Sequence, residues 1–360
     1  MRNLFGAVAA AVLLACAPPA LAQVETELPP VVAGAQPVTA EHIMIHGASL
    51  EGNLEGEAVD RDVIVFLPPS YFKDTTRRYP VVYALHGYSI GAEQWTHEIR
   101  VPQTIEGAFA TGAKEMIVVM PDSKTVYGGS MYSGSVTVGN FEQFIAHDVV
   151  SYIDAHYRTI PDRLSRGLIG HSMGGYGALR IGMKHPDVFG SLYVMSPCCL
   201  SPRPAPDPAS AHEQAFDKAV AAMKSPADAA NMSFFERAEL ATAAAWSPDP
   251  KNPPLYFDMP VKDGVVQPDV LAKWAANSPL DFIDQYIGNL RQYSAIALDV
   301  GDQDGLRFDT EKVHAVLDSY GIKNSFELYH GTHTSHVAYR FQNHVLPFFS
   351  EHLCFTQDCK

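Results

Sequence analysis

One short stretch of the chain has the residue types of a nucleophilic site. Residues 170–174 read Gly-His-Ser-Met-Gly and match the pattern Gly-x-Ser-x-Gly. An apolar stretch precedes them and a stretch of small residues follows, which predicts a sharp turn from a strand into a helix with Ser172 at its tip. The flanking glycines would leave space where a Cβ would meet the neighbouring strand and helix. Ser172 is therefore the predicted nucleophile, and the alternative is an ordinary turn with a structural serine.

A nucleophilic serine needs a base and an acid that orients the base. Asp304 follows an apolar stretch that ends at Val300, and His333 follows one that ends at Tyr329. Both lie after Ser172 in the order acid then histidine, at the carboxyl ends of predicted strands, where open α/β sheets bind ligands. The predicted catalytic residues are Ser172, Asp304 and His333.

His336 competes with His333 for the role of base, because the two would share one face if both lay on a helix. Gly331 allows a tight turn that leaves His333 on a loop. Thr334 or Ser335 can then cap the closing helix, which puts His336 in its first turn. A loop histidine can face both the serine and Asp304, so His333 is the expected base.

Two backbone N–H groups are expected to bind the negatively charged oxygen of a reacting carbonyl. The predicted strand before the first long helix ends in Leu-His-Gly-Tyr at residues 85–88. In a strand–turn–helix site of this kind, the loop after such a strand supplies one of these donors and the residue after the nucleophile supplies the other. The predicted donors are therefore the backbone N–H groups of Tyr88 and Met173. We expect His86 to be a packed histidine at the strand end.

The elements that must position these residues alternate along the chain. Predicted strands span residues 42–46, 62–67, 79–87, 116–122, 166–170, 190–196, 294–300 and 325–329, and predicted helices span 102–112, 140–156, 174–184, 309–320 and 336–353. Apolar strands that alternate with amphipathic helices predict an α/β fold with a mostly parallel central sheet and helices on both faces. Residues 201–254, rich in Ala and Pro, lie between two strands and are expected to form a helical cap insertion.

Composition excludes several classes of protein. Of the 360 residues, 47% are hydrophobic and 18% charged, which argues against a disordered chain. The net charge of −14 argues against nucleic-acid partners and an anionic membrane surface. His330, His333 and His336 lack the acidic or thiolate neighbours of a metal site. No metal or cofactor is expected, and the oligomeric state stays open.

The chain begins with a predicted secretory signal peptide, residues 1–22: Arg2, an uncharged apolar run and Ala-Leu-Ala before Gln23. An alternative interpretation is that Cys16 is the lipidated residue of a lipoprotein. A lead-in segment (residues 23–42), a domain of residues 43–354 and a tail (residues 355–360) would follow. No later run is long enough to span a membrane, so we expect a periplasmic or secreted protein.

Four cysteines remain after residue 22, and an oxidising compartment favours disulfides. Cys354 and Cys359 are expected to pair, because they are five residues apart near the C-terminus. Cys198 and Cys199 are adjacent and would bridge only with strain, but this pairing stays open.

Several stretches resemble the putative-esterase family of the α/β-hydrolase superfamily, which includes esterase D-type enzymes, feruloyl esterases, enterobactin-esterase-like proteins and mycolyltransferases. The resemblance covers roughly residues 45–353 and rests on residues 147–158, 170–179 and 185–189. Gly301-x-x-Asp304-x-Leu306 resembles the acid loop of the family and Gly331-x-His333 its histidine loop. The Trp that often follows the family's histidine is missing, which weakens an analogy in substrate.

The resemblance implies an α/β-hydrolase fold and a serine carboxylic ester hydrolase that acts on a small-molecule ester through an acyl-enzyme. An acyltransferase on the same three residues is the first alternative. A catalytically inactive hydrolase fold used for binding is the second.

Overall fold

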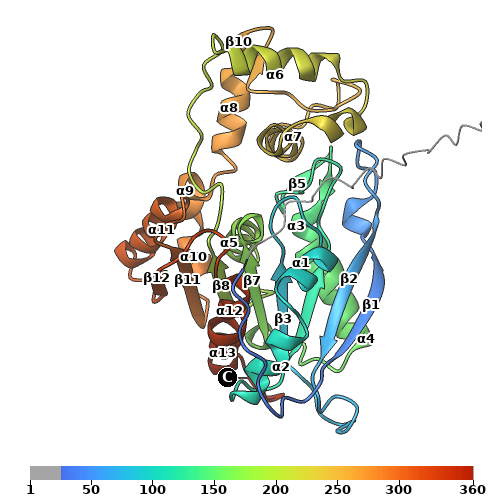
Figure 1. Cartoon of the computed structure of the whole chain (residues 1–360), viewed down its shortest axis with the longest axis vertical. Coiled ribbons are helices and arrows are strands. Elements are labelled where there is room, and N and C mark those ends of the chain that lie inside the picture. Colours follow the sequence, from blue (N-terminus) through green and yellow to red (C-terminus); the bar gives the residue numbers. More distant parts are fainter. Residues whose placement is uncertain (1–25, 360) are drawn as a thin grey trace, which may run out of the picture.

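An eight-stranded sheet forms the centre of the protein in the computed structural model, which describes residues 26–359 (Figure 1). In spatial order its strands are β1 (Thr39–His46), β2 (Asp60–Leu67), β4 (Ile117–Pro121), β3 (Val81–Leu85), β7 (Arg166–His171), β8 (Ser191–Met195), β11 (Ala295–Gly301) and β12 (Ser325–Tyr329). The β1–β2 and β2–β4 pairs are antiparallel, and the remaining neighbours in this sheet are parallel. The predicted mostly parallel sheet is confirmed.

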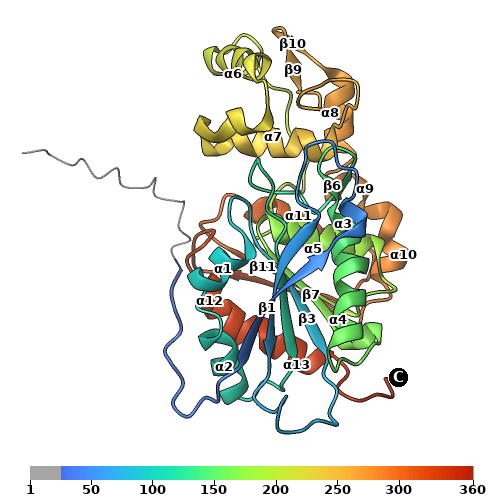
Figure 2. The same cartoon turned by 90° about the vertical axis from the view of Figure 1, so that its right-hand side faces the viewer.

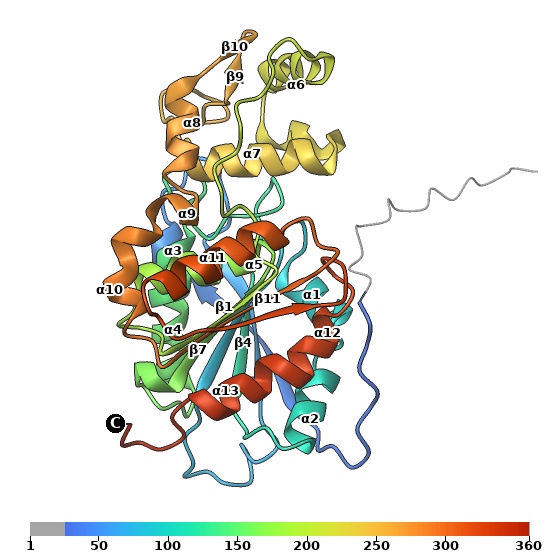
Figure 3. The same cartoon turned by 90° about the vertical axis from the view of Figure 1, so that its left-hand side faces the viewer.

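Helices cover both faces of the sheet (Figures 2 and 3). One face carries α1 (Ala92–Glu98), α2 (Gln103–Ala110), α12 (Val337–Arg340) and α13 (Leu346–His352). The other carries α3 (Phe141–Gln143), α4 (Val150–His156), α5 (Met173–Lys184), α9 (Pro279–Phe282), α10 (Ile287–Leu290) and α11 (Arg307–Ser319). Successive side chains of a strand alternate between faces, so Val81 and Tyr83 pack in one core and Val82 and Ala84 in the other.

Two of the predicted long helices contain a π-helical segment. Phe144–Val149 connects α3 to α4, and Phe341–Val345 connects α12 to α13. The predicted start at Asn140 is confirmed, since its side chain accepts a hydrogen bond from the Gln143 N–H. The predicted cap of the closing helix is wrong, because His336 occupies the cap position. Ser335 Oγ instead accepts a hydrogen bond from the Thr332 N–H and holds the preceding turn.

Within the chain between β8 and β11, the part from α6 to α8 forms a layer that stands above the carboxyl ends of the central strands (Figures 1 and 2). We call it the cap. It contains α6 (Ala211–Ala222), α7 (Phe234–Trp246), the hairpin of β9 (Val261–Lys262) and β10 (Val265–Val266), and α8 (Pro268–Ala275). Ser233 and Glu236 form a capping box at the start of α7. The layer thus continues past residue 254, where the sequence analysis ended it.

A short hairpin, β5 (Gly134–Ser135) and β6 (Gly139–Asn140), reaches from the layer of the sheet to the cap. Ser135 Oγ donates to the Ala244 carbonyl at 2.6 Å, and Trp246 Nε1 donates to Ser133 Oγ at 3.1 Å. Thr137 Oγ1 donates to the Tyr256 carbonyl at 2.5 Å. The contacts between the two layers thus include hydrogen bonds from side chains of this hairpin segment.

The cysteines near the C-terminus form a disulfide, whereas the adjacent pair that follows β8 does not. The predicted disulfide between Cys354 and Cys359 is confirmed, while Cys198 and Cys199 are free. Within residues 26–359, no helix has the length and apolar character needed to cross a bilayer. The predicted signal peptide, residues 1–22, and the alternative lipid site at Cys16 lie outside the described residues.

Candidate active site

The turn at Ser172 has the expected geometry. β7 ends at His171, α5 begins at Met173, and Ser172 between them has φ 59°. A positive φ is uncommon for a residue other than glycine and is often found at functional sites. The strand, turn and helix thus hold the Ser172 hydroxyl on a sharply bent backbone.

The two glycines of the motif have no room for a side chain. A Cβ on Gly170 would lie 2.0 Å from the Gly174 carbonyl oxygen, and a Cβ on Gly174 would lie 2.0 Å from the Leu85 carbonyl oxygen. Both contacts are with backbone atoms, which cannot rotate away as a flexible side chain can. The predicted reason for the glycines, close approach of strand and helix, is confirmed.

The structure brings Ser172, His333 and Asp304 together in one hydrogen-bonded chain. His333 Nε2 lies 2.9 Å from Ser172 Oγ, and His333 Nδ1 lies 2.7 Å from Asp304 Oδ2. The Asp304 side chain is 3% exposed, whereas that of His333 is 35% exposed. The arrangement gives a hydroxyl, an imidazole that contacts it and a buried carboxylate behind the imidazole.

Asp304 is held in its ionised form. Burial by itself would raise the pKa of this carboxyl, but the hydrogen bond and charge of His333 and the Leu306 N–H outweigh it, so the pKa lies below its usual value. An ionised Asp304 accepts the Nδ1–H of His333, which leaves Nε2 of a neutral ring free to accept the serine proton.

The loops that carry Asp304 and His333 are connected by backbone and side-chain hydrogen bonds. The Gln303 N–H donates to the Gly331 carbonyl at 2.9 Å, and the Gly331 N–H donates to Asp302 Oδ1 at 3.0 Å. A Cβ on Gly301 would lie 2.2 Å from the Gly331 carbonyl oxygen, so the two loops touch where they leave β11 and β12. Acid and histidine are thus positioned by adjacent parallel strands.

The other two histidines of this loop have different partners. His330 Nδ1 lies 3.0 Å from Asp302 Oδ2 on the exposed side of the loop. His336 Nε2 donates to the His330 carbonyl at 3.1 Å, and its Nδ1 lies 2.9 Å from Glu27. Of the competing pair, His333 and not His336 contacts Ser172 and Asp304.

His171, which the sequence analysis did not single out, supports the His333 loop. Its Nε2–H donates to the His333 carbonyl at 2.9 Å, and the two rings lie 4.8 Å apart. Burial, followed by the charge of His333, lowers the pKa of His171 to about 3. His171 is therefore a neutral donor. The sequence feature that could have indicated this role is the polar His171 side chain at the end of the apolar strand β7.

The loop after β3 lies beside the turn, as expected. A Cβ on Gly87 would lie 3.5 Å from Ser172 Cβ, which places the Gly87–Tyr88 segment next to the serine. Met173 is the first residue of α5, where N–H groups lack partners within the helix. The assignment of the Tyr88 and Met173 N–H groups to an oxyanion site stays a prediction.

His86 is a packed histidine, in agreement with the expectation from sequence. Its side chain is fully buried, its Nε2 accepts a hydrogen bond from the Ser123 N–H at 2.9 Å, and its Nδ1–H donates to the Gly87 carbonyl at 2.8 Å. Burial lowers its pKa, so the ring is neutral. It holds the loop that carries Tyr88 in place.

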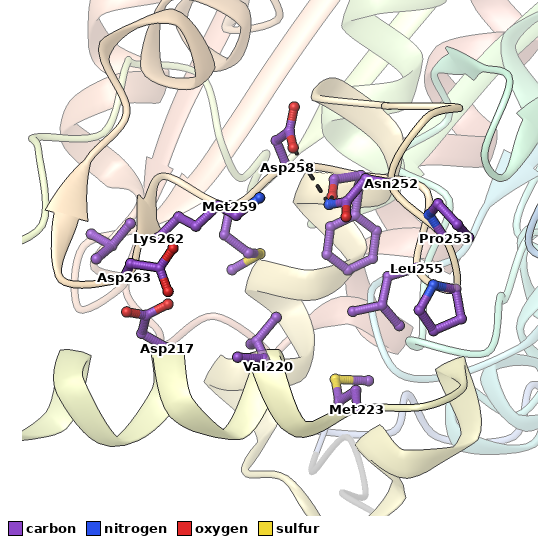
Figure 4. Close-up of a pocket in the computed structure, with 14 residues that line it drawn as sticks. Asp217, Val220, Met223, Asn252, Pro253, Leu255, Asp258, Met259, Lys262 and Asp263 are labelled. Atoms are coloured by element: carbon purple, nitrogen blue, oxygen red, sulfur yellow. Dashed lines mark hydrogen bonds between the residues drawn. The ribbon is translucent and has the colours of Figure 1, made fainter.

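Neither a metal centre nor the cavity of the cap coincides with the three residues of the candidate site. Within residues 26–359 no group of three or more His, Cys, Asp or Glu side chains is arranged to hold a metal ion. A cavity of about 260 Å³ lies inside the cap, between α6 and the segment 252–263 (Figure 4). Asp217, Val220, Met223, Leu255 and Met259 are among its lining residues, and none of the three triad candidates is.

Comparisons with known proteins agree with this architecture. Over 148 residues the chain is 29% identical to an endo-1,4-beta-xylanase/feruloyl esterase of Xylanibacter ruminicola, and over 135 residues it is 36% identical to an esterase of Mycobacterium tuberculosis. These matches cover 40% and 36% of this chain but only 20% and 27% of the relatives' own lengths.

Solved structures show the same fold. A ferulic acid esterase aligns with a TM-score of 0.62 at 22% identity, over 88% of this chain and 99% of that one. An S-formylglutathione hydrolase from Staphylococcus aureus aligns with a TM-score of 0.57 at 14% identity, with the same coverages. Residues 58–353 match the family described as "Putative esterase". The chain belongs to this putative-esterase family and has its α/β-hydrolase fold.

Proposed function

We propose that the protein is a serine carboxylic ester hydrolase that acts on small-molecule esters through an acyl-enzyme. The observation that carries the proposal is the continuous chain from Ser172 Oγ through the His333 ring to the buried Asp304 carboxylate, at 2.9 and 2.7 Å. These are the contacts that a nucleophile, its base and an orienting acid require.

In the first half of the reaction, Ser172 Oγ attacks the ester carbonyl while His333 Nε2 takes the hydroxyl proton. The Tyr88 and Met173 N–H groups hold the negative oxygen of the tetrahedral intermediate. Asp304 stabilises the imidazolium through Nδ1–H. The intermediate collapses when the carbon–oxygen bond to the alcohol breaks and His333 returns the proton to the leaving alkoxide.

In the second half, His333 takes a proton from a water molecule, and the hydroxide attacks the acyl-serine carbonyl. The same two N–H groups hold the second oxyanion. Collapse releases the carboxylic acid and restores the Ser172 hydroxyl with the proton from His333. No step needs a cofactor.

The location of this chemistry is also proposed. We infer that residues 1–22 direct the chain out of the cytoplasm as a cleaved signal peptide, and that the mature protein is periplasmic or secreted. The Cys354–Cys359 disulfide supports this, because disulfides persist in oxidising compartments. Sequencing the N-terminus of the mature protein tests it: Gln23 is expected first, whereas a lipidated Cys16 would contradict cleavage after residue 22.

A fluorophosphonate probe tests the nucleophile directly. The probe should add one adduct, located by peptide mapping to Ser172, and the labelled protein should lose turnover of nitrophenyl, cinnamoyl and thioester substrates. His333→Ala should label far more slowly, while His336→Ala serves as the matched control from the same loop. A wild-type protein that stays unlabelled would favour the inactive binding fold. Transfer of the acyl group to an added alcohol in preference to water would favour the acyltransferase.

A further inference from the structure

Two adjacent cysteines lie directly behind the candidate nucleophile. The chain leaves β8 through Ser196, whose N–H donates to the Asp299 carbonyl at 2.8 Å. Two residues later the Cys198 N–H donates to the Ser172 carbonyl at 3.1 Å. The Leu280 N–H donates to the Leu200 carbonyl at 2.9 Å. The Cys198–Cys199 pair therefore lies in a segment held between the Ser172 turn and helix α9.

The two sulfur atoms are within reach of each other. Cys198 Sγ and Cys199 Sγ lie 2.6 Å apart, and both residues are free and partly buried. A disulfide bond is about 2.05 Å long, so only a small approach of the two atoms separates this pair from a bond. Cys199 has φ 62°, a backbone conformation that residues other than glycine seldom adopt.

One thiol of the pair is prepared to react as a thiolate. The hydrogen bond with Cys198, together with the charge of the Arg203 guanidinium, lowers the pKa of Cys199 below its ordinary value, although burial opposes this. The pKa of Cys198 is raised, chiefly by the same hydrogen bond and by burial. Such a pair has the attacking thiolate and the second thiol that disulfide exchange requires.

We propose that Cys198 and Cys199 form a redox modification site that closes to a vicinal disulfide and thereby lowers the reactivity of Ser172. The co-reactant is a low-molecular-weight disulfide such as glutathione disulfide. The Cys199 thiolate attacks one of its sulfurs and releases one glutathione thiolate, which leaves a mixed disulfide on Cys199. Cys198 loses its proton and attacks Cys199 Sγ, the mixed bond breaks and the second glutathione leaves. Two electrons pass from the cysteines to the glutathione disulfide.

The consequence for Ser172 follows from the backbone. A bond between neighbouring cysteines closes a small ring that contains their peptide bond, so the Cys198–Cys199 backbone must change conformation. The Cys198 N–H on this unit donates to the Ser172 carbonyl at 3.1 Å, and that carbonyl also accepts the Tyr176 N–H of α5 at 3.0 Å. The nucleophile sits on a turn that depends on such contacts, and small displacements of a reacting group cost large factors in rate. Closure is expected to slow the reaction of Ser172 by at least about threefold.

The effect on reactivity rests on the proposed role of Ser172, whereas formation of the disulfide does not. The test therefore measures the disulfide and the reactivity of Ser172 separately. The full protein is treated with glutathione disulfide or with a mild thiol reductant. Intact mass, thiol titration and unreduced peptide mapping follow the cysteines, and the rate of fluorophosphonate labelling follows Ser172. In the oxidised protein we expect both thiols to be lost, a mass lower by two hydrogens, no glutathione adduct, and slower labelling that reduction reverses.

The double variant Cys198→Ser/Cys199→Ser is the control, and its labelling rate should not respond to either treatment. The Cys198→Ser variant should retain a glutathione adduct on Cys199, because no second thiol can displace it. Two thiols that stay free, or a glutathione on each sulfur, would overturn the site. A vicinal disulfide with an unchanged labelling rate would overturn its effect on Ser172. If no form labels, the proposed nucleophile fails, and the mass data still decide whether the disulfide forms.

Discussion

The carboxyl edge of the sheet and the cap above it are held together by different contacts. At the edge, backbone meets backbone: Gly170, Gly174 and Gly301 each lie where a Cβ would come within about 2 Å of another residue's carbonyl oxygen. In the cap, α7 is attached to the β5–β6 segment partly through side chains, such as Ser135 and Trp246. Close backbone packing tolerates almost no substitution, whereas side-chain contacts can be exchanged one at a time. We therefore propose that the edge sets the chemistry and that the cap can vary to select the substrate.

The largest effect is expected from the edge itself. Ser172→Ala should reduce ester turnover by about 10⁴-fold or more, because it removes the proposed nucleophile and the members of a triad act as a unit. The circular dichroism spectrum and melting temperature should stay near wild type, since only one oxygen is lost. Retention of a tenth of wild-type turnover would contradict the assignment.

Gly174→Ala tests the backbone packing of the edge. The new Cβ would lie 2.0 Å from the Leu85 carbonyl oxygen, so strand β3 or helix α5 must move. We expect a loss of about 3 kcal/mol or more in the free energy of unfolding, measured with denaturant. Gly288→Ala in α10 is the matched control, because no atom lies within 4 Å of its added Cβ. If the two variants are equally stable, the backbone packing at the edge is no less tolerant of substitution than the side-chain contacts of the cap.

His171→Phe tests how the edge positions the base. The ring is kept, but the N–H that donates to the His333 carbonyl is lost. We expect kcat to fall about 10- to 100-fold with little change in KM, because His333 loses one of its fixed contacts. His171→Gln, which retains a donor, should recover part of the loss, and His336→Ala should reduce kcat only modestly. A change confined to stability would mean that His171 has a packing role alone.

Glu55, beside the hairpin that reaches the cap, should make stability depend on pH. Both of its carboxylate oxygens are buried without a hydrogen-bond partner, and burial, with the charge of Glu57, raises its pKa to about 9. The unfolded chain releases this proton near pH 4.3, whereas the folded protein holds it until about pH 9, so stability falls as pH rises through this window.

Glu55→Gln replaces the titrating carboxyl with a neutral amide of nearly the same size and shape. It should gain about 1 kcal/mol or more at pH 8 relative to wild type and less at pH 5, measured by denaturant unfolding at both pH values. The exposed Glu351→Gln should show the same difference from wild type at each pH. If the effect of Glu55→Gln is the same at both pH values, the Glu55 carboxyl of the wild-type protein is already ionised in the folded state, and the prediction is wrong.

An effect of similar size is expected where the cap is attached. The Ala244 carbonyl in the last turn of α7 has no helical donor, because residue 248 is a proline, and the Ser135 hydroxyl supplies the hydrogen bond. Ser135→Ala should cost about 1–2 kcal/mol of stability and change the KM values of different esters unequally, with kcat nearly constant. Ser319→Ala, at an exposed helix end, is the control. A uniform loss of kcat would mean that the cap positions the catalytic residues themselves.

Much of the candidate site could be predicted from the sequence, because each of its residues follows a strand that the local sequence predicts. Ser172 follows an apolar strand between glycines, and Asp304 and His333 each follow a strand of their own. Parallel strands bring their carboxyl ends to one edge, so the order of these residues along the chain is enough to bring them together. The preference for His333 over His336 likewise depended on a turn at Gly331 that the local sequence allows.

Other features depend on contacts between distant segments. The sequence pattern did not predict α1, a short helix stabilised by Trp95 packed on Phe341. The predicted helix cap failed because the Thr332 N–H competes for the Ser335 hydroxyl. His171 gained a role only because the His333 loop returns across its ring. The extent of the cap beyond residue 254, and the position of Cys198 and Cys199 behind Ser172, were likewise decided by tertiary packing, since sequence periodicity reports burial but not which segments meet.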